Sequence, residues 1–355
     1  MPVPEKIAAW QMTVPGELTR VDLPTPQLAP GEVLVEIAGC GVCHTDIGYF
    51  YQGVPTVTKP PLTLGHEISG RVVAGEESLL GKEVIIPAVM PCNHCPICAA
   101  GRGNRCLAQK MPGNSLGIYG GFASHIPVPA ADLCLVGERK LPLEHLAVVA
   151  DAISTPYQAA VRAALAPGDL VVVIGATGGV GTYMTQVAAA FGARAVVATG
   201  RNAEKLARTT EFGATHTINT AGLSVKEVKE TFKAYCKANG LPSNYGWKIF
   251  EVTGTKEGQE IGLDLLPFIG KLILIGYGMQ KTEFMFSRLM ALDAEIIGTW
   301  GCLPEYYPDV LKMVLDGRVQ LEPFVEVRPM SEIREVFEQA HAGRLSRRVV
   351  LTPDF

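Results

Sequence analysis

The clearest hydrophobic pattern in the chain lies in residues 167–200. An unbroken apolar run over residues 170–174 predicts a strand that is buried on both faces. Four glycines follow within seven residues, residues 182–191 predict a helix, and residues 195–199 predict a second strand. A strand, a glycine turn, a helix and a second strand within about 30 residues are typical of a unit that binds a dinucleotide.

Glycine suits this turn because a pyrophosphate binds to backbone N–H groups at a helix N-terminus, and a Cβ would hold it away. An ordinary α/β crossover with a glycine turn is the alternative, but the strand and the helix on either side favour nucleotide binding. The residues expected to contact the cofactor are Gly175, Thr177, Gly178, Gly179, Val180 and Gly181 in the turn, Gly200 and Arg201 after the second strand, and Ile275 and Tyr277 after a later strand.

Strands and helices continue to alternate beyond this unit. Strands are predicted at residues 216–219, 247–252, 271–276 and 295–300, and helices at residues 203–212, 225–238, 258–267, 305–316 and 331–341. This alternation predicts a doubly wound, parallel α/β sheet.

Residues 1–150 follow a different pattern, mainly β with frequent turns. Residues 31–38 alternate apolar and polar side chains and predict a half-buried strand. Two short strands, broken by Pro127 and Pro129, are expected further on, and a helical pattern over residues 141–165 leads into the glycine-turn unit.

Composition narrows the class of protein. A chain of 355 residues with 48% hydrophobic residues can form two domains with ample cores. The net charge of −4 argues against nucleic-acid or anionic-membrane partners. No apolar run approaches the about 20 residues of a membrane span, and residues 1–10 do not read as an export signal, so a cytoplasmic location is expected. Nine cysteines then favour metal ligation and free thiols over disulfides.

Four of these cysteines form a cluster, Cys92, Cys95, Cys98 and Cys106. Gaps of two, two and seven residues let the thiolates converge on one tetrahedral ion, and four sulfur ligands leave no open position, so a zinc here would be structural. An iron–sulfur cluster and a zinc-finger-like nucleic-acid module are alternatives, although basic residues are sparse nearby. His94 is expected to be a solvated loop residue.

Five motifs occur in an order that resembles the zinc-dependent medium-chain alcohol dehydrogenases: GCGVCHTD, LGHEISG, the cysteine cluster, DAISTPYQA and VIGATGGVG. The resemblance covers essentially the whole chain. It implies a GroES-like, β-rich catalytic domain over residues 1–152 and 299–355, and a Rossmann domain over residues 153–298. It also implies two zinc ions per subunit, a nicotinamide cofactor, and a homodimer or homotetramer.

The resemblance assigns the ligands of a catalytic zinc to Cys43, His66 and Asp151. Most family members have Cys at the third position, so Asp151 is a variant ligand. Glu67 is implied as an outer or transient zinc ligand, and Asp46 as the partner that orients His66. Three protein ligands leave a fourth position for water or a substrate oxygen.

The same motif implies a route for the substrate proton. Thr45 corresponds to the hydroxyl residue that contacts the substrate oxygen, and His44 to a residue that contacts the cofactor pyrophosphate; a surface loop histidine is the alternative for His44. Family members often complete this relay with a histidine where this chain has Gly48, so the proton is expected to leave by another route, such as water.

The residues after the second strand give opposing indications of cofactor preference. Gly200 replaces the acidic residue that grips the adenosine ribose, and Arg201 could pair with a 2′-phosphate, which favours NADP. Arg201 stands alone in an exposed turn beside Glu204, however, and the resemblance favours NAD. NAD is therefore expected, with NADP possible.

Segments that extend beyond these motifs indicate the substrate. QKMPGNSLGIYGGFASHIPVP, TVTKPPLTLGHEISG and GTWGCLPEYYP resemble the subfamily of 6-hydroxycyclohex-1-ene-1-carbonyl-CoA dehydrogenases of anaerobic aromatic degradation. The resemblance implies an acyl-CoA substrate whose ring alcohol becomes an enone; other cyclic, allylic or benzylic alcohols are the alternative. Candidate pocket residues are Tyr49, Ala88, Trp300 and Tyr306.

Two other classes remain as alternatives. A zinc-free quinone or enoyl reductase of the same superfamily would lack both groups of metal ligands. A zinc-lobe binding module without catalysis would not need Cys43, His66, Thr45 and the glycine turn.

Overall fold

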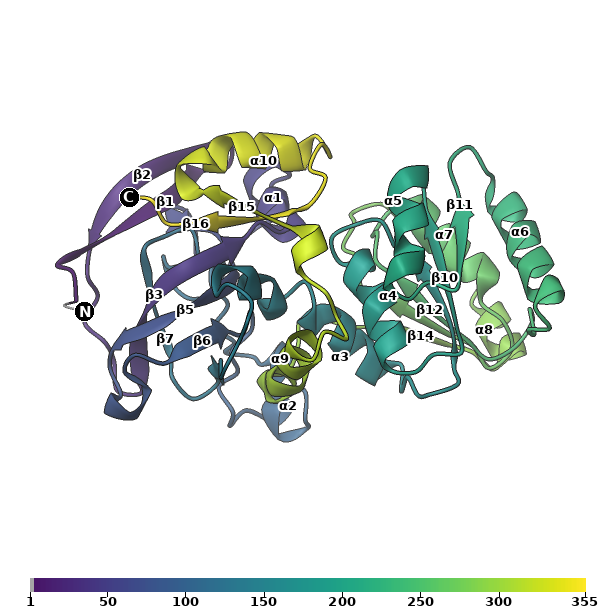
Figure 1. The fold of residues 1–355 in the computed structure, drawn as a ribbon, viewed down its shortest axis with the longest axis horizontal. Coiled ribbons are helices and arrows are strands. Elements are labelled where there is room, and N and C mark those ends of the chain that lie inside the picture. Colours follow the sequence, from purple (N-terminus) through teal and green to yellow (C-terminus); the bar gives the residue numbers. More distant parts are fainter. Residues whose placement is uncertain (1–2) are drawn as a thin grey trace. The chain divides into compact units, whose positions relative to one another are not determined.

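The computed structural model describes residues 3–355, which form two compact units (Figure 1). Unit 1 comprises the described residues up to Ser154 together with Gly301–Asp316 and Leu321–Phe355; unit 2 comprises Thr155–Trp300 and Gly317–Gln320. Residues 317–320 were expected in the catalytic domain. They group with unit 2, where the Gln186 side chain accepts a hydrogen bond from Gln320 N (2.7 Å) and donates one to Gln320 O (3.3 Å).

Unit 2 is built on the predicted parallel sheet, with the strand order β11-β10-β9-β12-β13-β14. Its strands are β9 (Leu170–Ile174), β10 (Ala195–Gly200), β11 (His216–Asn219), β12 (Trp247–Glu251), β13 (Lys271–Leu274) and β14 (Glu295–Gly298). Its helices are α3 (Ser154–Arg162, whose first residue belongs to unit 1), α4 (Gly181–Ala190), α5 (Ala203–Arg208), α6 (Val225–Ala238), α7 (Lys256–Leu265) and α8 (Ser287–Leu292).

Helices cover both faces of this sheet, which explains the continuous apolar runs in its central strands. Every residue of β9 is buried, and Leu170, Val172 and Ile174 pack with α6 and α7 on one face. Helices α4 and α5 lie on the other face (Figure 1). Helix α6 begins at a capping box in which Ser224 and Glu227 satisfy each other's backbone N–H groups.

Unit 1 is the predicted β-rich part of the chain. Its strands are β1 (Lys6–Val14), β2 (Glu17–Pro24), β3 (Glu32–Gly41), β4 (Leu62–Thr63), β5 (Glu67–Ala74), β6 (Glu83–Ile86), β7 (His125–Pro129), β8 (Cys134–Leu135), β15 (Val325–Pro329) and β16 (Arg348–Thr352). Its helices are α1 (His44–Tyr51), α2 (Pro96–Ala99), α9 (Tyr307–Leu315) and α10 (Ile333–His341). One sheet has the order β2-β1-β4; the other has the order β15-β16-β3-β5-β6-β8, with β7 also paired to β3.

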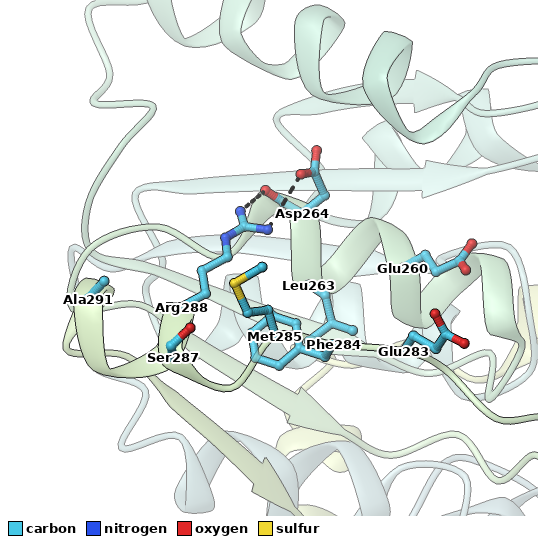
Figure 2. Close-up of a pocket in the computed structure, with 9 residues that line it drawn as sticks. All are labelled: Glu260, Leu263, Asp264, Glu283, Phe284, Met285, Ser287, Arg288 and Ala291. Carbon is cyan, nitrogen blue, oxygen red and sulfur yellow. Dashed lines mark hydrogen bonds and ion pairs between the residues drawn. The ribbon is translucent and has the colours of Figure 1, made fainter.

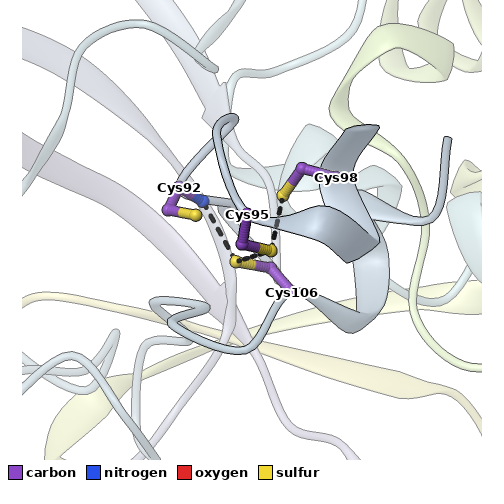
Figure 3. A group of neighbouring side chains, drawn as sticks. All are labelled: Cys92, Cys95, Cys98 and Cys106. Carbon is purple, nitrogen blue, oxygen red and sulfur yellow. Dashed lines mark hydrogen bonds between the residues drawn. The ribbon is translucent and has the colours of Figure 1, made fainter. Parts of the chain in front are cut away.

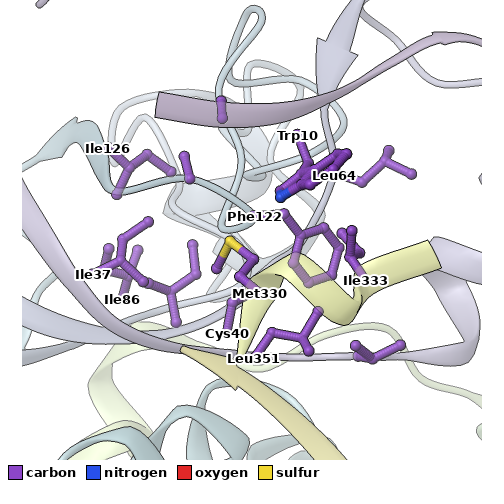
Figure 4. Packing of buried hydrophobic residues seen from close by; sticks show 14 of the residues in the cluster. Trp10, Ile37, Cys40, Leu64, Ile86, Phe122, Ile126, Met330, Ile333 and Leu351 are labelled. Carbon is purple, nitrogen blue, oxygen red and sulfur yellow. The ribbon is translucent and has the colours of Figure 1, made fainter. Parts of the chain in front are cut away.

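The core of unit 1 joins segments that are distant in the sequence. Figure 4 shows Trp10, Phe122 and Cys40 close to Met330 and Ile333 near the start of α10. Phe337 of α10 makes edge-to-face ring contacts with Phe50 and Phe122. No helix in the described residues is both long and apolar enough to span a membrane.

The segment forms two short strands, β7 and β8, as expected, but the expectation that Pro127 and Pro129 break the strands is wrong. Both lie within the continuous strand β7, which is antiparallel to β3. Ile37 N donates to Ser124 O, and Ala130 N donates to Gly31 O, so even-numbered residues of this segment point their backbone groups toward β3. The prolines occupy the alternate positions, where an N–H is not required.

The helical pattern over residues 141–165 does not form one helix. A 3-10 helix spans Glu144–Ala150, and α3 begins only at Ser154. The carbonyl oxygen of Ala150 accepts hydrogen bonds from Ser154 Oγ (3.0 Å) and Tyr307 Oη (2.5 Å). The backbone leaves helical geometry at Asp151, the third candidate zinc ligand.

Candidate active site and cofactor-binding turn

Cys43, His66 and Asp151 come together within unit 1, although 108 residues separate the first from the last. Cys43 follows β3 and caps α1, His66 directly precedes β5, and Asp151 lies at the break before α3. Asp151 Oδ2 is 3.5 Å from Cys43 Sγ and 3.6 Å from His66 Nε2. A sulfur, an imidazole nitrogen and a carboxylate oxygen in such a group match the ligand types that zinc prefers.

Asp46 links the two segments that carry Cys43 and His66. Its Oδ2 accepts a hydrogen bond from Cys43 N (3.1 Å), and its Oδ1 accepts one from Gly65 N (3.0 Å). Oδ1 also lies 3.2 Å from His66 Nδ1, which leaves His66 Nε2 directed toward Asp151. This is the contact expected of a carboxylate that orients a metal-binding histidine.

Glu67 joins the same group, but its main partner, Arg348, was not anticipated from the sequence. Glu67 is fully buried, and its carboxylate accepts hydrogen bonds from Arg348 Nε (2.7 Å) and Arg348 Nη2. A Cβ at Gly41 would overlap this carboxylate, so the glycine permits the close approach of β3. Burial raises the pKa of Glu67, and the Arg348 guanidinium opposes that rise.

The electrostatic environment of this group favours a positive charge. Burial alone would lower the pKa of His66, but the Asp46 carboxylate and contacts with Asp151 and Cys43 raise it well above its usual range. The donor set and its surroundings therefore fit a cation held by Cys43, His66 and Asp151.

The proposed relay residues lie beside these ligands on α1. Thr45 is partly buried, and His44 is exposed at the first position of the helix. Partial desolvation of its ring lowers the pKa of His44, although the residue as a whole is exposed, and the positive charges of His341 and Arg348 lower it further. A Cβ at Gly48 would lie 3.5 Å from Val54 and 3.8 Å from Gln52 Oε1, so a neutral amide lies near the position of the missing histidine.

The four candidate pocket residues differ in their surroundings. Tyr49 is 5% exposed within the core of unit 1, and its hydroxyl accepts a hydrogen bond from Asn114 Nδ2 (2.5 Å). Ala88 is also buried, Tyr306 is partly exposed, and Trp300, in unit 2, is 37% exposed. The aromatic ring buried beside Ala88 is Tyr307, which the sequence analysis did not single out; its hydroxyl accepts a hydrogen bond from Ala88 N (3.0 Å).

The four clustered cysteines form a second metal-binding group, shown in Figure 3. Cys95 Sγ lies 3.5 Å from Cys98 Sγ and 3.8 Å from Cys106 Sγ, and Cys106 Sγ accepts a hydrogen bond from Cys92 N (3.2 Å). Backbone N–H groups of Cys98 and Leu107 lower the pKa of Cys95 to about 6, while burial and the neighbouring thiols raise the pKa of Cys98 to about 12. The His94 ring lies outside the group, with Nδ1 2.5 Å from Cys92 O.

The glycine turn after β9 has the close backbone packing that its sequence predicts. Gly175 has φ +89°, and a Cβ at Gly181, where α4 begins, would overlap the Gly175 carbonyl. A Cβ at Gly200 would lie 2.7 Å from the Thr177 methyl group, so Thr177 occupies the space beside Gly200. Gly178, Gly179 and Arg201 are exposed, Thr177, Val180 and Ile275 are partly buried, and Tyr277 is 65% exposed.

Comparison with known proteins identifies the family. Residues 29–138 match the alcohol dehydrogenase GroES-like domain, and residues 179–316 match the zinc-binding dehydrogenase domain. An alcohol dehydrogenase of Geobacillus stearothermophilus is 30% identical over 335 residues, which cover 93% of this chain and 94% of the relative. The chain belongs to the zinc-binding medium-chain alcohol dehydrogenases.

Two more distant members show the range of this dehydrogenase family. The erythritol/L-threitol dehydrogenase of Mycolicibacterium smegmatis is 25% identical, with 99% of each chain covered. The structure of acetophenone reductase from Geotrichum candidum in complex with NAD is 26% identical, with a TM-score of 0.86 and coverage of 99% of this chain and 98% of the other. The GroES-like and Rossmann folds predicted from the sequence are thereby confirmed, and so is the class of enzyme: a zinc-dependent alcohol or polyol dehydrogenase that uses a nicotinamide cofactor.

Proposed function

We propose that this dehydrogenase oxidises a ring secondary alcohol conjugated to an acyl-CoA thioester. The proposed substrate is 6-hydroxycyclohex-1-ene-1-carbonyl-CoA, the product is the 6-oxo enone, and the setting is cytoplasmic, anaerobic aromatic degradation. The observation that supports the chemistry is the convergence of Cys43, His66 and Asp151 on one small volume. The substrate rests on the resemblance of segments that extend beyond the shared motifs, including the one that contains Asn114, the partner of Tyr49.

In this proposal, Cys43, His66 and Asp151 hold the catalytic zinc, while Cys92, Cys95, Cys98 and Cys106 hold a structural zinc. When bound, zinc polarises the substrate oxygen, and the nicotinamide accepts the hydride that leaves the carbinol carbon. The Thr45 hydroxyl accepts the hydroxyl proton and passes it to water, since Gly48 offers no base. His44 contacts the cofactor pyrophosphate, and Asp46 keeps His66 Nε2 directed at the metal.

A second substrate class has support from the relatives. One relative is named for erythritol and L-threitol, and one structural neighbour is named for acetophenone, an aromatic ketone. A cyclic, allylic or benzylic alcohol without CoA, or a polyol, is therefore the alternative substrate. NAD is the proposed cofactor, because the exposed Arg201 is the single cation proposed near the ribose position and Glu204 in the same turn would oppose a 2′-phosphate. These two features outweigh the loss of the acidic residue at Gly200, which by itself favours NADP.

One set of steady-state measurements tests both the proposed substrate and the proposed cofactor. The panel would contain the CoA thioester, cyclohex-2-enol, benzyl alcohol and erythritol, each with NAD and with NADP. We expect the thioester to give the highest kcat/KM, with NAD preferred. Equal kcat/KM for cyclohex-2-enol and the thioester would reject CoA recognition. An NADP preference above about tenfold that Arg201→Ala removes would assign the phosphate contact to Arg201.

Self-association into a homodimer or homotetramer is part of the proposal. Strand β14 is an edge of its sheet, and the exposed side chains near it include Phe286 (75%) and Met290 (80%). Figure 2 shows Met285 and Arg288 on the neighbouring pocket wall, where Arg288 contacts Asp264. An unpaired strand edge beside exposed apolar side chains is a surface that commonly pairs with a second copy.

A further inference from the structure

Glu251 is a buried carboxylate to which the proposed mechanism assigns no role. It is the last residue of β12 and is 0% exposed. Its Oε1 accepts hydrogen bonds from Thr253 N (2.8 Å) and Thr253 Oγ1 (2.5 Å), and its Oε2 accepts one from Gly254 N (3.1 Å). Burial raises the pKa of Glu251, and these hydrogen bonds oppose the rise. Burying a carboxylate costs free energy, and here three hydrogen-bond donors are arranged to offset that cost. This arrangement points to a role beyond filling space.

The backbone of the same residue holds a second loop. The Glu251 carbonyl oxygen accepts hydrogen bonds from Ile275 N (2.9 Å) and Gly276 N (3.1 Å), just after β13. Val252 N donates to Ile174 O (3.1 Å), at the end of β9. Two consecutive residues, Glu251 and Val252, therefore tie the ends of three adjacent parallel strands together.

The segments that Glu251 holds are in close backbone contact. A Cβ at Gly175 would overlap the Thr253 methyl group, and a Cβ at Gly276 or Gly278 would overlap the backbone of Gly254. Any displacement of Thr253 and Gly254 is therefore passed to the glycine turn after β9 and to the loop after β13.

This junction lies where nucleotides bind in such sheets. The strand order β11-β10-β9-β12-β13-β14 reverses direction between β9 and β12, and ligands of doubly wound sheets bind outside the carboxyl ends of the strands at that reversal. Gly175, Thr253 and Gly276 all follow such carboxyl ends.

We propose that Glu251 is a positioning residue for the nicotinamide cofactor. Its carboxylate holds Thr253 and Gly254 in the conformation that lets the loops after β9, β12 and β13 receive the cofactor together. It acts through these residues and touches neither the substrate nor the metal ligands. The proposal rests on the use of a nicotinamide cofactor and is independent of the substrate.

Three substitutions test this proposal by direct titration of the purified holoenzyme with NADH and NADPH. Glu251→Gln places an NH₂ group against either Gly254 N–H or the Thr253 donors, so we expect the Kd of the preferred cofactor to rise about tenfold. Thr253→Val removes the hydroxyl but keeps the methyl packing, and is expected to raise the Kd as well. Thr253→Ser keeps the hydroxyl and should leave the Kd within about twofold of wild type.

A structural role alone would give a different result. Ile249→Val, at a fully buried position of the same strand, serves as the control for lost stability and should lower Tm with no change in Kd. Hydrogen exchange of the segment containing Gly254 should accelerate in Glu251→Gln and not in Ile249→Val, with both zinc ions retained in each. An unchanged Kd for Glu251→Gln overturns the proposal. If the wild type bound neither NADH nor NADPH, the result would instead reject the use of a nicotinamide cofactor, on which the proposal rests.

Discussion

Tyr307 fixes the conformation of the segment that carries Asp151. Its buried hydroxyl donates to Ala150 O (2.5 Å), accepts from Ala88 N (3.0 Å), and lies 3.4 Å from Ser154 Oγ. These contacts surround the break at Asp151, so the position of the carboxylate depends on a side chain 156 residues further along the sequence.

Tyr307→Phe should therefore weaken the proposed catalytic zinc site. The substitution leaves Ala88 N and Ala150 O without this partner and frees the backbone at Asp151. Loss of a group that supports a metal ligand typically costs 10- to 100-fold in metal affinity, so we expect a loss of about that size. Competition with a chelator, followed by metal analysis, measures it. Tyr306→Phe, at the adjacent, partly exposed position, is the control and should retain wild-type affinity.

The residues that could be recognised from the sequence are those in short motifs. Cys43 and Asp46 occur in one motif and His66 in another. Only the contact of Cys43 with Asp46 is local, and the resemblance of the motifs to the family is what joined His66 to them. Arg348 lies 281 residues from Glu67, and Tyr307 lies 219 residues from Ala88, so no local pattern marks either contact. Tyr306 and Tyr307 both lie in the helix predicted over residues 305–316, so the sequence did not separate them, and only packing distinguishes the buried ring of Tyr307.

Among the elements, the lobe that contains α2 depends most on its proposed metal. Residues 92–106 contribute the short helix α2 and one 3-10 turn, and α2 has no buried residue. We expect a segment with so little apolar burial to depend on ligation of its thiolates, because a closed metal site contributes directly to folding free energy.

Substitutions in the two metal-binding groups should therefore affect different properties: thermal stability for the cysteine cluster and turnover for the group of Cys43, His66 and Asp151. Cys95→Ser is expected to lower Tm by several degrees, since each lost kcal/mol shifts Tm by about 2–4 °C in a domain of 150–250 residues. Cys43→Ser should abolish turnover with a much smaller change in Tm, because only the open site does chemistry. Calorimetry, zinc analysis and activity on the same preparations make the comparison. Loss of activity in both variants with unchanged Tm would contradict a structural role for the cysteine group.

The predictability of each element follows from its periodicity and length. Strand β9 and helix α6 have the predicted bounds, because one is a continuous apolar run and the other has a capping signal at its start. Strand β7 was misjudged because a proline is normally read as the end of a strand. In β7 the prolines occupy the positions where no backbone N–H is required for pairing with β3, so the strand continues through them. The 3-10 helix at Glu144–Ala150 was taken for α-helix because the two have similar apolar periods over a few residues.

For the whole molecule, the proposed assembly is the property most open to test. Met290→Glu places a charge among exposed apolar side chains near β14, so we expect sedimentation to shift toward the monomer. Leu135→Glu, at an exposed position of β8, an edge strand of unit 1, is the control and should leave the sedimentation coefficient unchanged. If Met290→Glu sediments as wild type does, α8 and β14 do not form the interface.

The division of the chain has a consequence for biosynthesis. Residues 155–300 complete most of unit 2 as one stretch, and this unit needs only residues 317–320 in addition. Unit 1 is completed later, because β15 and β16 are translated after all of unit 2, and β16 pairs with β3 and supplies Arg348 to Glu67. On the ribosome, the Rossmann fold can therefore form while β3 still has an open edge. Cys43, His66 and Asp151 emerge well before the cation that balances Glu67, so metal insertion during translation would meet one more uncompensated carboxylate than it meets in the finished enzyme.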